Sequence, residues 1–137
     1  WAMMVKPADL MVLGEADKRT DKYNILHLSG EPEYDFKVCL ERFADYPGDI
    51  VNWSVKDNGL SLLDGKKLYQ RPILGGLNNK GNILSGTEDA IRQEVEDAIR
   101  GFGSMSMMIG ADCTIQGEGI SLDRIKAAVE AAHNFKF

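Results

Sequence analysis

Apolar residues fall into four short runs along the chain, at residues 24–28, 50–55, 72–77 and 104–109. Each run shows little alternation of polar and apolar positions, and turn-forming residues close the first three. This pattern is typical of strands that are covered on both faces, as in a parallel sheet. The runs therefore predict four buried strands.

The stretches around these runs carry apolar residues at helical spacing. Helices are predicted over residues 7–18, 34–46 and 60–68, then from a cap at Ser85 or Thr87, and finally from a cap at Ser121. Ser85 and Glu88 have the spacing of a capping box. Two of these helices carry a predicted buried stripe, formed by Ile91, Val95, Ala98 and Phe102 in one and by Leu122, Ile125, Val129 and Ala132 in the other.

Strands that alternate with helices indicate right-handed βαβ crossovers and an α/β fold with a parallel sheet. The chain holds four such units, whereas a closed (β/α)₈ TIM barrel needs eight and typically about 250 residues. The pattern leaves two architectures open, a small open sheet or half a barrel. In either one we expect the strands in sequential order, with His27 and Cys113 at the same end of the sheet.

Composition narrows the class of protein. The 137 residues include 16 basic and 21 acidic side chains, for a net charge of −5, and 44% are hydrophobic. These values predict one globular domain over residues 1–137, without the basic surface that nucleic acid or anionic lipid requires. No apolar stretch approaches the roughly 18–20 residues that span a bilayer. Cys39 and Cys113 form no CxxC motif, which favours a reducing cytoplasm. Because Trp1 begins the chain in place of Met, we expect a partial polypeptide.

Polar and reactive side chains follow the predicted strands. In parallel α/β folds the loops at the carboxyl ends of the strands carry the functional site. These positions include His27, Ser29, Trp53, Asp57, Asn78, Asp112 and Cys113. A neutral imidazole and a thiolate are both zinc ligands, but catalytic zinc usually has three protein ligands, so the pair alone is incomplete. The alternatives are a core histidine at position 27, a packed thiol at position 113 and a core tryptophan at position 53.

Several motifs together resemble a known family. They are Ile25-Leu-His-Leu-Ser-Gly30, Ile50-Val-Asn-Trp53, Ile73-Leu-Gly-Gly-Leu77, Leu84-Ser-Gly-Thr87, Gly110-Ala-Asp-Cys-Thr-Ile115 and a closing helix that ends near His133. In order and spacing they resemble the carboxyl-terminal half of the uroporphyrinogen decarboxylase superfamily, which consists of TIM barrels. The resemblance implies that the chain supplies strands five to eight of such a barrel and that the amino-terminal half is absent.

The resemblance also implies a metal site. Corrinoid-linked methyltransferases of the superfamily hold zinc with an HxC pair and a later Cys. Here His27 matches the His and Cys113 matches the later Cys, while Ser29 stands where the first Cys would be. A hydroxyl is a far poorer zinc ligand than a thiolate. A third ligand would therefore have to come from Glu31, Asp112 or the missing half.

The first functional hypothesis is zinc-dependent methyl transfer to or from a corrinoid or a thiol. In it His27 and Cys113 are the catalytic and metal-binding residues, and a corrinoid protein is the partner. Substrate contacts are expected at Trp53, Asp57, Asn78 and Asp112. An alternative is metal-free decarboxylation of uroporphyrinogen in porphyrin biosynthesis, for which only Lys56 and Lys80 offer cations. A second alternative is a non-catalytic half-barrel that binds a partner. A half-barrel is expected to be a homodimer or a fragment of a longer chain.

Overall fold

The computed structural model describes residues 3–19, 21–30, 37–103, 106–115 and 120–137. The strands of this part of the chain form one parallel sheet in the order β1-β2-β3-β4. Their bounds are β1 Ile25–Leu28, β2 Ile50–Trp53, β3 Ile73–Leu77 and β4 Met107–Ala111. The predicted α/β class and the sequential strand order are confirmed. Four parallel units in this order are compatible with half of a TIM barrel.

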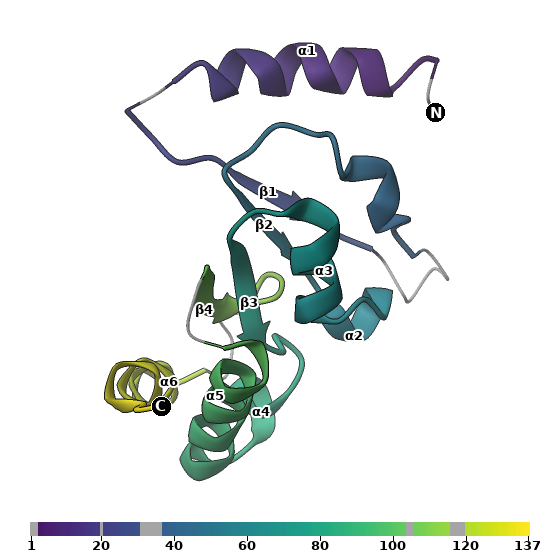
Figure 1. Ribbon diagram of the computed structural model, residues 1–137. Coiled ribbons are helices and arrows are strands. Elements are labelled where there is room, and N and C mark those ends of the chain that lie inside the picture. The colour runs from purple at the N-terminus through teal and green to yellow at the C-terminus, as the bar shows by residue number, and fades with distance from the viewer. Residues whose placement is uncertain (1–2, 20, 31–36, 104–105, 116–119) are drawn as a thin grey trace.

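Helices connect and flank the strands (Figure 1). They are α1 Lys6–Asp17, the 3₁₀ helix η2 Leu40–Phe43, α2 Val55–Asn58, α3 Leu62–Tyr69, α4 Asn82–Ser85, α5 Glu88–Phe102 and α6 Leu122–Asn134. Figure 1 shows α3 in front of the sheet, α1 along its upper side, and α5 and α6 next to each other at its lower end. None of the helices in the described residues is long and apolar enough to cross a membrane.

Side-chain caps explain where several helices begin. Thr87 accepts a hydrogen bond from the Ala90 amide at the start of α5, and Ser121 accepts one from the Arg124 amide at the start of α6. Such caps satisfy amides that have no partner inside the helix. The cap predicted at Ser121 is therefore confirmed. Of the two caps proposed for α5, Thr87 is the one used, and Ser85 instead ends the short helix α4.

The predicted helix over residues 34–46 is wrong for its described part. Residues 37–39 lie outside any helix, and only the 3₁₀ turn η2 forms. Directly after this turn, the Arg71 guanidinium donates hydrogen bonds to the carbonyls of Ala44, Tyr46 and Gly48. A long-range cation that binds these carbonyls competes with continued helical hydrogen bonding. Residues 34–36 of the prediction lie outside the described residues.

The main core lies between the sheet and the helices over β1, β2 and β3. Val51, Trp53 and Ile73 are 0% exposed there, and Leu26 and Leu28 pack with them. Alternate residues of a strand point to opposite faces, so the neighbours of these residues lie on the other face of the sheet. That second face carries His27 together with Ile25 and Met108, whose exposures are 50% and 47%. Within the described residues no layer covers it.

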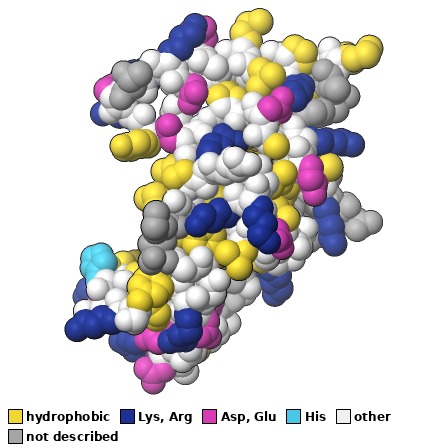
Figure 2. All heavy atoms as spheres, viewed as in Figure 1, with side chains coloured by type: hydrophobic (Ala, Val, Ile, Leu, Met, Phe, Trp, Pro, Cys, Tyr) yellow, Lys and Arg dark blue, Asp and Glu magenta, His cyan; other side chains and the backbone are white. Residues whose placement is uncertain are grey.

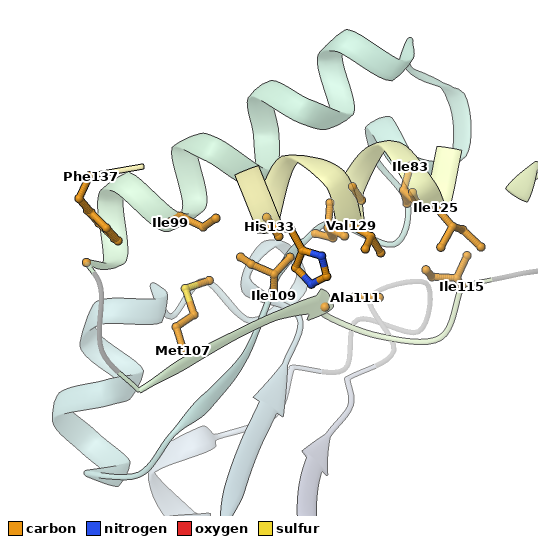
Figure 3. A pocket seen from close by; sticks show the side chains of 15 residues that line it. Ile83, Ile99, Met107, Ile109, Ala111, Ile115, Ile125, Val129, His133 and Phe137 are labelled. Carbon is orange, nitrogen blue, oxygen red and sulfur yellow. The ribbon is translucent and has the colours of Figure 1, made fainter. Parts of the chain in front are cut away.

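The predicted buried stripe of α6 is also wrong. Leu122, Ile125 and Val129 are 64%, 43% and 48% exposed, whereas Ala127, Ala128 and Ala131 make the buried contacts. α6 packs mainly against α5 and stands away from β4. The space between them is an apolar cavity of about 540 Å³, into which side chains of β4 and α6 point (Figure 3). His133 lies at its border.

The face of the molecule in Figure 2 carries basic and acidic side chains interspersed, with apolar side chains between them. Met3, Met4 and Met11, in and just before α1, are 89%, 83% and 73% exposed. Apolar surface is therefore exposed in two places, on α1 and beside the edge strand β4.

Candidate functional site

The candidate site lies where the two edge strands of the sheet come together. His27 is on β1 and Cys113 follows β4, 86 residues later, yet His27 Nε2 lies 3.6 Å from Cys113 Sγ. Ser29 Oγ is 3.9 Å from the same sulfur. Edge strands separated by two others can meet only if the sheet curls strongly, as barrel sheets do. The prediction that His27 and Cys113 lie at one end of the sheet is confirmed.

Asn52 orients the His27 ring. Its side chain, 5% exposed, lies on β2 directly beside His27 in the register of the sheet. Asn52 Nδ2 donates hydrogen bonds to the Leu74 and Ala111 carbonyls, at 2.8 and 3.1 Å. Its Oδ1 therefore faces His27 Nδ1, at 2.5 Å, and must accept the Nδ1 proton. Of the two neutral tautomers, this network selects the one with its proton on Nδ1, in which Nε2 directs a lone pair toward Cys113.

A second asparagine holds the loop that carries Cys113. The Asn79 main-chain N–H donates to Asp112 Oδ1 at 2.9 Å, and Asn79 Nδ2 donates to the Thr114 carbonyl at 2.9 Å. Asp112 is 3% exposed. Burial raises the pKa of the Asp112 carboxyl above its usual value, and hydrogen bonds from the Asn79 amide and the Ser54 hydroxyl partly offset that rise. Asp112 thus binds backbone and side-chain donors inside the fold.

The expected substrate contacts do not line the cavity at His27. The prediction of a substrate contact at Trp53 is wrong. Its side chain is 0% exposed and packs in the core against Gly65, and its Nε1–H donates a hydrogen bond to the Leu60 carbonyl. A side chain without exposed surface cannot stack on a substrate. Asp57 lies 3.6 Å from Lys80. Asn78 and Asp112 line a small hollow of about 250 Å³ that shares no lining residue with the cavity at His27.

The cavity at His27 encloses about 450 Å³. Ser29, Lys37, Cys39 and Arg42 also line it, with Leu28, Val38 and Phe43 as apolar walls. Cys39 is exposed and lies 3.4 Å from a Glu41 carboxylate oxygen, so it belongs to the surface and not to the core. A volume of this size accommodates a small organic molecule beside the His27 ring, although Cys113 is not among the lining residues.

The geometry of the pair fits part of a zinc site. Zinc bonds of about 2.0–2.1 Å to nitrogen and 2.3 Å to sulfur, meeting near the tetrahedral angle, separate the two donor atoms by about 3.5 Å. The observed Nε2 to Sγ distance is 3.6 Å. Within the described residues, however, no group of three or more His, Cys, Asp or Glu side chains is placed to hold a metal ion. Asp112, one of the three sources considered for a third ligand, is buried and bound by other groups, and Glu31 lies outside the described residues.

Asn52 and Asn79 are the residues that sequence reasoning missed. Asn52 interrupts the apolar run at 50–55, and a lone amide in a buried strand needs a partner because an unpaired buried amide is costly. That signal was present in the sequence. Nothing comparable in the sequence distinguishes Asn79 from its neighbour Asn78, because both asparagines follow the same strand and their burial and hydrogen-bond partners are set by the fold.

Comparison with known proteins shows the fold. No family model matches the chain, and no curated protein matches it. Among solved structures, a methyltransferase from Methanosarcina mazei superposes with a TM-score of 0.64 at 22% sequence identity. The match covers 90% of this chain and 34% of that chain, so the present sequence spans about a third of the neighbour. The fold and the site together define a parallel α/β sheet, compatible with a half TIM barrel, that carries an imidazole and thiol pair at its carboxyl edge.

Proposed function

We propose that the protein is part of a barrel enzyme that transfers a methyl group to or from a thiol or a corrinoid, with zinc held by His27 and Cys113. The observation that carries the proposal is the 3.6 Å separation between an oriented imidazole nitrogen and a thiol, which matches the spacing of two ligands on one tetrahedral ion. The shared fold with a methyltransferase supports the same reaction class.

When bound, zinc supplies a Lewis acid that lowers the pKa of a coordinated thiol and so favours its nucleophilic thiolate. Residues of this chain orient the two proposed zinc ligands. Asn52 keeps the His27 lone pair directed at Cys113, and the Asn79 contacts hold the Cys113 loop. The cavity beside His27 offers room for the acceptor, with apolar walls at Leu28, Val38 and Phe43. A third protein ligand must come from outside the described residues.

A corrinoid-bearing protein is the proposed partner. A corrinoid is a broad, flat cofactor, and its methyl group can reach the pair only from an open edge. His27 is exposed, and within the described residues the face that carries it has no covering layer. Substrate contacts from Asp57 and Asn78 remain predictions.

The decisive experiment measures zinc in the protein purified from its complete reading frame. About one zinc per chain is expected, with loss of the metal in Cys113→Ser and in His27→Ala. Cys39→Ser is the matched control, because that thiol lines the same cavity without contacting Cys113, and it should keep its zinc. Methyl transfer from methylcobalamin to a small thiol, followed by the cobalamin absorption spectrum, tests the reaction itself. The proposal would be overturned if the purified protein contained no zinc and a chelator left the cobalamin absorption spectrum of the reaction unchanged.

We also propose that the working protein covers the open faces of this half-barrel with a second copy or with further chain. Edge strands present unpaired N–H and C=O groups, and large exposed apolar patches mark interfaces. The two edges, the apolar cavity at β4 and the exposed methionines at α1 all meet that description. Light scattering on the 137-residue chain should show a dimer or larger species. A monodisperse 15.2 kDa monomer that binds no hydrophobic dye would contradict this.

A further inference from the structure

We propose that Asn79 is a positioning residue that sets the Cys113 thiol at its working distance from His27. The inference rests on the proposed function, because it concerns the same pair of groups. It assigns to Asn79 a role that involves no contact with substrate or metal and acts only through the loop that carries the thiol.

The first support is the placement of the two hydrogen bonds. Asn79 binds Asp112 through its main-chain N–H and Thr114 through its side-chain Nδ2, both at 2.9 Å. These partners are the residues immediately before and after Cys113. One residue at the end of β3 therefore fixes both neighbours of the thiol.

The second support is the lack of regular structure at this point. Residues 112–115 lie beyond the end of β4 and in no helix. The Asp112 N–H bonds to the Leu77 carbonyl, which secures only the side that precedes Cys113. Beyond Cys113, the Asn79 side chain supplies the hydrogen bond to Thr114. Without that bond the loop could move the sulfur away from the 3.6 Å contact.

The third support is an unpaired atom. Asn79 is 8% exposed, and its Oδ1 is buried without a hydrogen-bond partner among the described residues. The opposite orientation of the amide would bring Oδ1 against the Thr114 carbonyl, where two acceptors repel. Among the described residues, this acceptor therefore stays buried without a partner while the Nδ2 donor bonds to Thr114. Local rules are broken in this way mainly where function requires it.

The test compares Asn79→Ala with Asn82→Ala. Asn82 is the matched control because it lies in the same connection, and its Nδ2 bonds only to the Glu94 carboxylate on α5. In Asn79→Ala we expect zinc affinity, measured by competition with a chromophoric chelator, to fall about 10–100-fold, the usual effect of losing an outer hydrogen bond that orients a ligand. Asn82→Ala should keep its affinity within about twofold of the unsubstituted protein, which is far less than that change.

A second readout needs no metal. In the zinc-free protein, a nuclear Overhauser contact between the His27 ring and the Cys113 Cβ protons should be present in the unsubstituted chain and in Asn82→Ala, and absent in Asn79→Ala. If zinc does not bind at all, the proposed function fails while this contact still decides the role of Asn79. If Asn79→Ala does not fold, hydrogen exchange of the Asn79 Nδ2 protons is measured in the unsubstituted protein, where slow exchange is expected. A retained contact with unchanged affinity in Asn79→Ala, or fast exchange of those protons, would overturn the inference.

Discussion

The two flanks of the sheet are equally apolar in sequence but differ in how they are packed. Over β1, β2 and β3, Val51, Trp53 and Ile73 are fully buried by helices of the same chain. Beside β4, Ile125 and Val129 of α6 stay 43% and 48% exposed and line an open cavity. The difference shows that apolar periodicity reports which residues are suited to burial. Whether they are buried depends on the presence of a neighbouring element.

The largest effect is expected at the packed flank. Trp53→Ala should lower the free energy of unfolding by about 3–5 kcal/mol, because it removes a fully buried ring and leaves a cavity against Gly65. Chemical denaturation monitored by circular dichroism measures the change. A loss below about 1 kcal/mol would mean that this flank is as loosely packed as the α6 flank.

The next effect is expected at the carboxyl edge that joins the two flanks. Asn52→Ala leaves the Leu74 and Ala111 carbonyls without their Nδ2 donor and should cost about 1–3 kcal/mol of folding free energy. It also frees the His27 ring to rotate, so zinc affinity should fall about 10–100-fold. Calorimetric zinc titration checks the second effect. Equal affinities for Asn52→Ala and the unsubstituted protein would show that the ring is held by other contacts.

A smaller effect is expected in the pH dependence of stability at the packed flank, through Tyr69. Burial is the main cause that raises the pKa of Tyr69 to about 12, from an ordinary value of 10.0. The folded chain then keeps a proton that the unfolded chain releases, so stability falls as the pH rises from 10 toward 12. Tyr69→Phe removes this proton and the hydrogen bond from the Tyr69 hydroxyl to the Leu40 carbonyl. It should cost about 1 kcal/mol at pH 7 and unfold less steeply with alkali. An unchanged slope between pH 10 and 12 would contradict the assignment.

The smallest effect is expected at the open flank. Val129→Ala should change the stability of the isolated chain by no more than about 0.5 kcal/mol, since the side chain is half exposed and alanine favours the helix. Thermal unfolding at low protein concentration measures this. A loss comparable to that of Trp53→Ala would mean that a partner already covers the cavity under those conditions.

Local sequence determined most of the secondary structure. Each of the four apolar runs contributed to one parallel strand, although β4 runs over Met107–Ala111 and not over the predicted 104–109, of which 104–105 lie outside the described residues. Of the predicted stripe of α5, Ile91, Val95 and Phe102 are buried and Ala98 is partly buried. Ser121 began α6 as predicted because a cap acts on amides two or three residues away. Predictions failed where distant groups intervened, as directly after η2, where the Arg71 guanidinium binds carbonyls more than twenty residues earlier in the chain.

The candidate site divides in the same way. The sequence by itself predicted His27 and Cys113 at one end of a parallel sheet, because residue type, the ends of the apolar runs and the alternation of strands with helices can all be read along the chain. Only the tertiary structure decided that they meet, since the contact spans 86 residues and depends on the curl of the whole sheet. It also decided that Trp53 belongs to the core, that Asn52 bonds to the His27 ring and that Asn79 bonds to the loop that carries Cys113. Those roles are set by burial and by bonds between strands, which no single segment of the chain encodes.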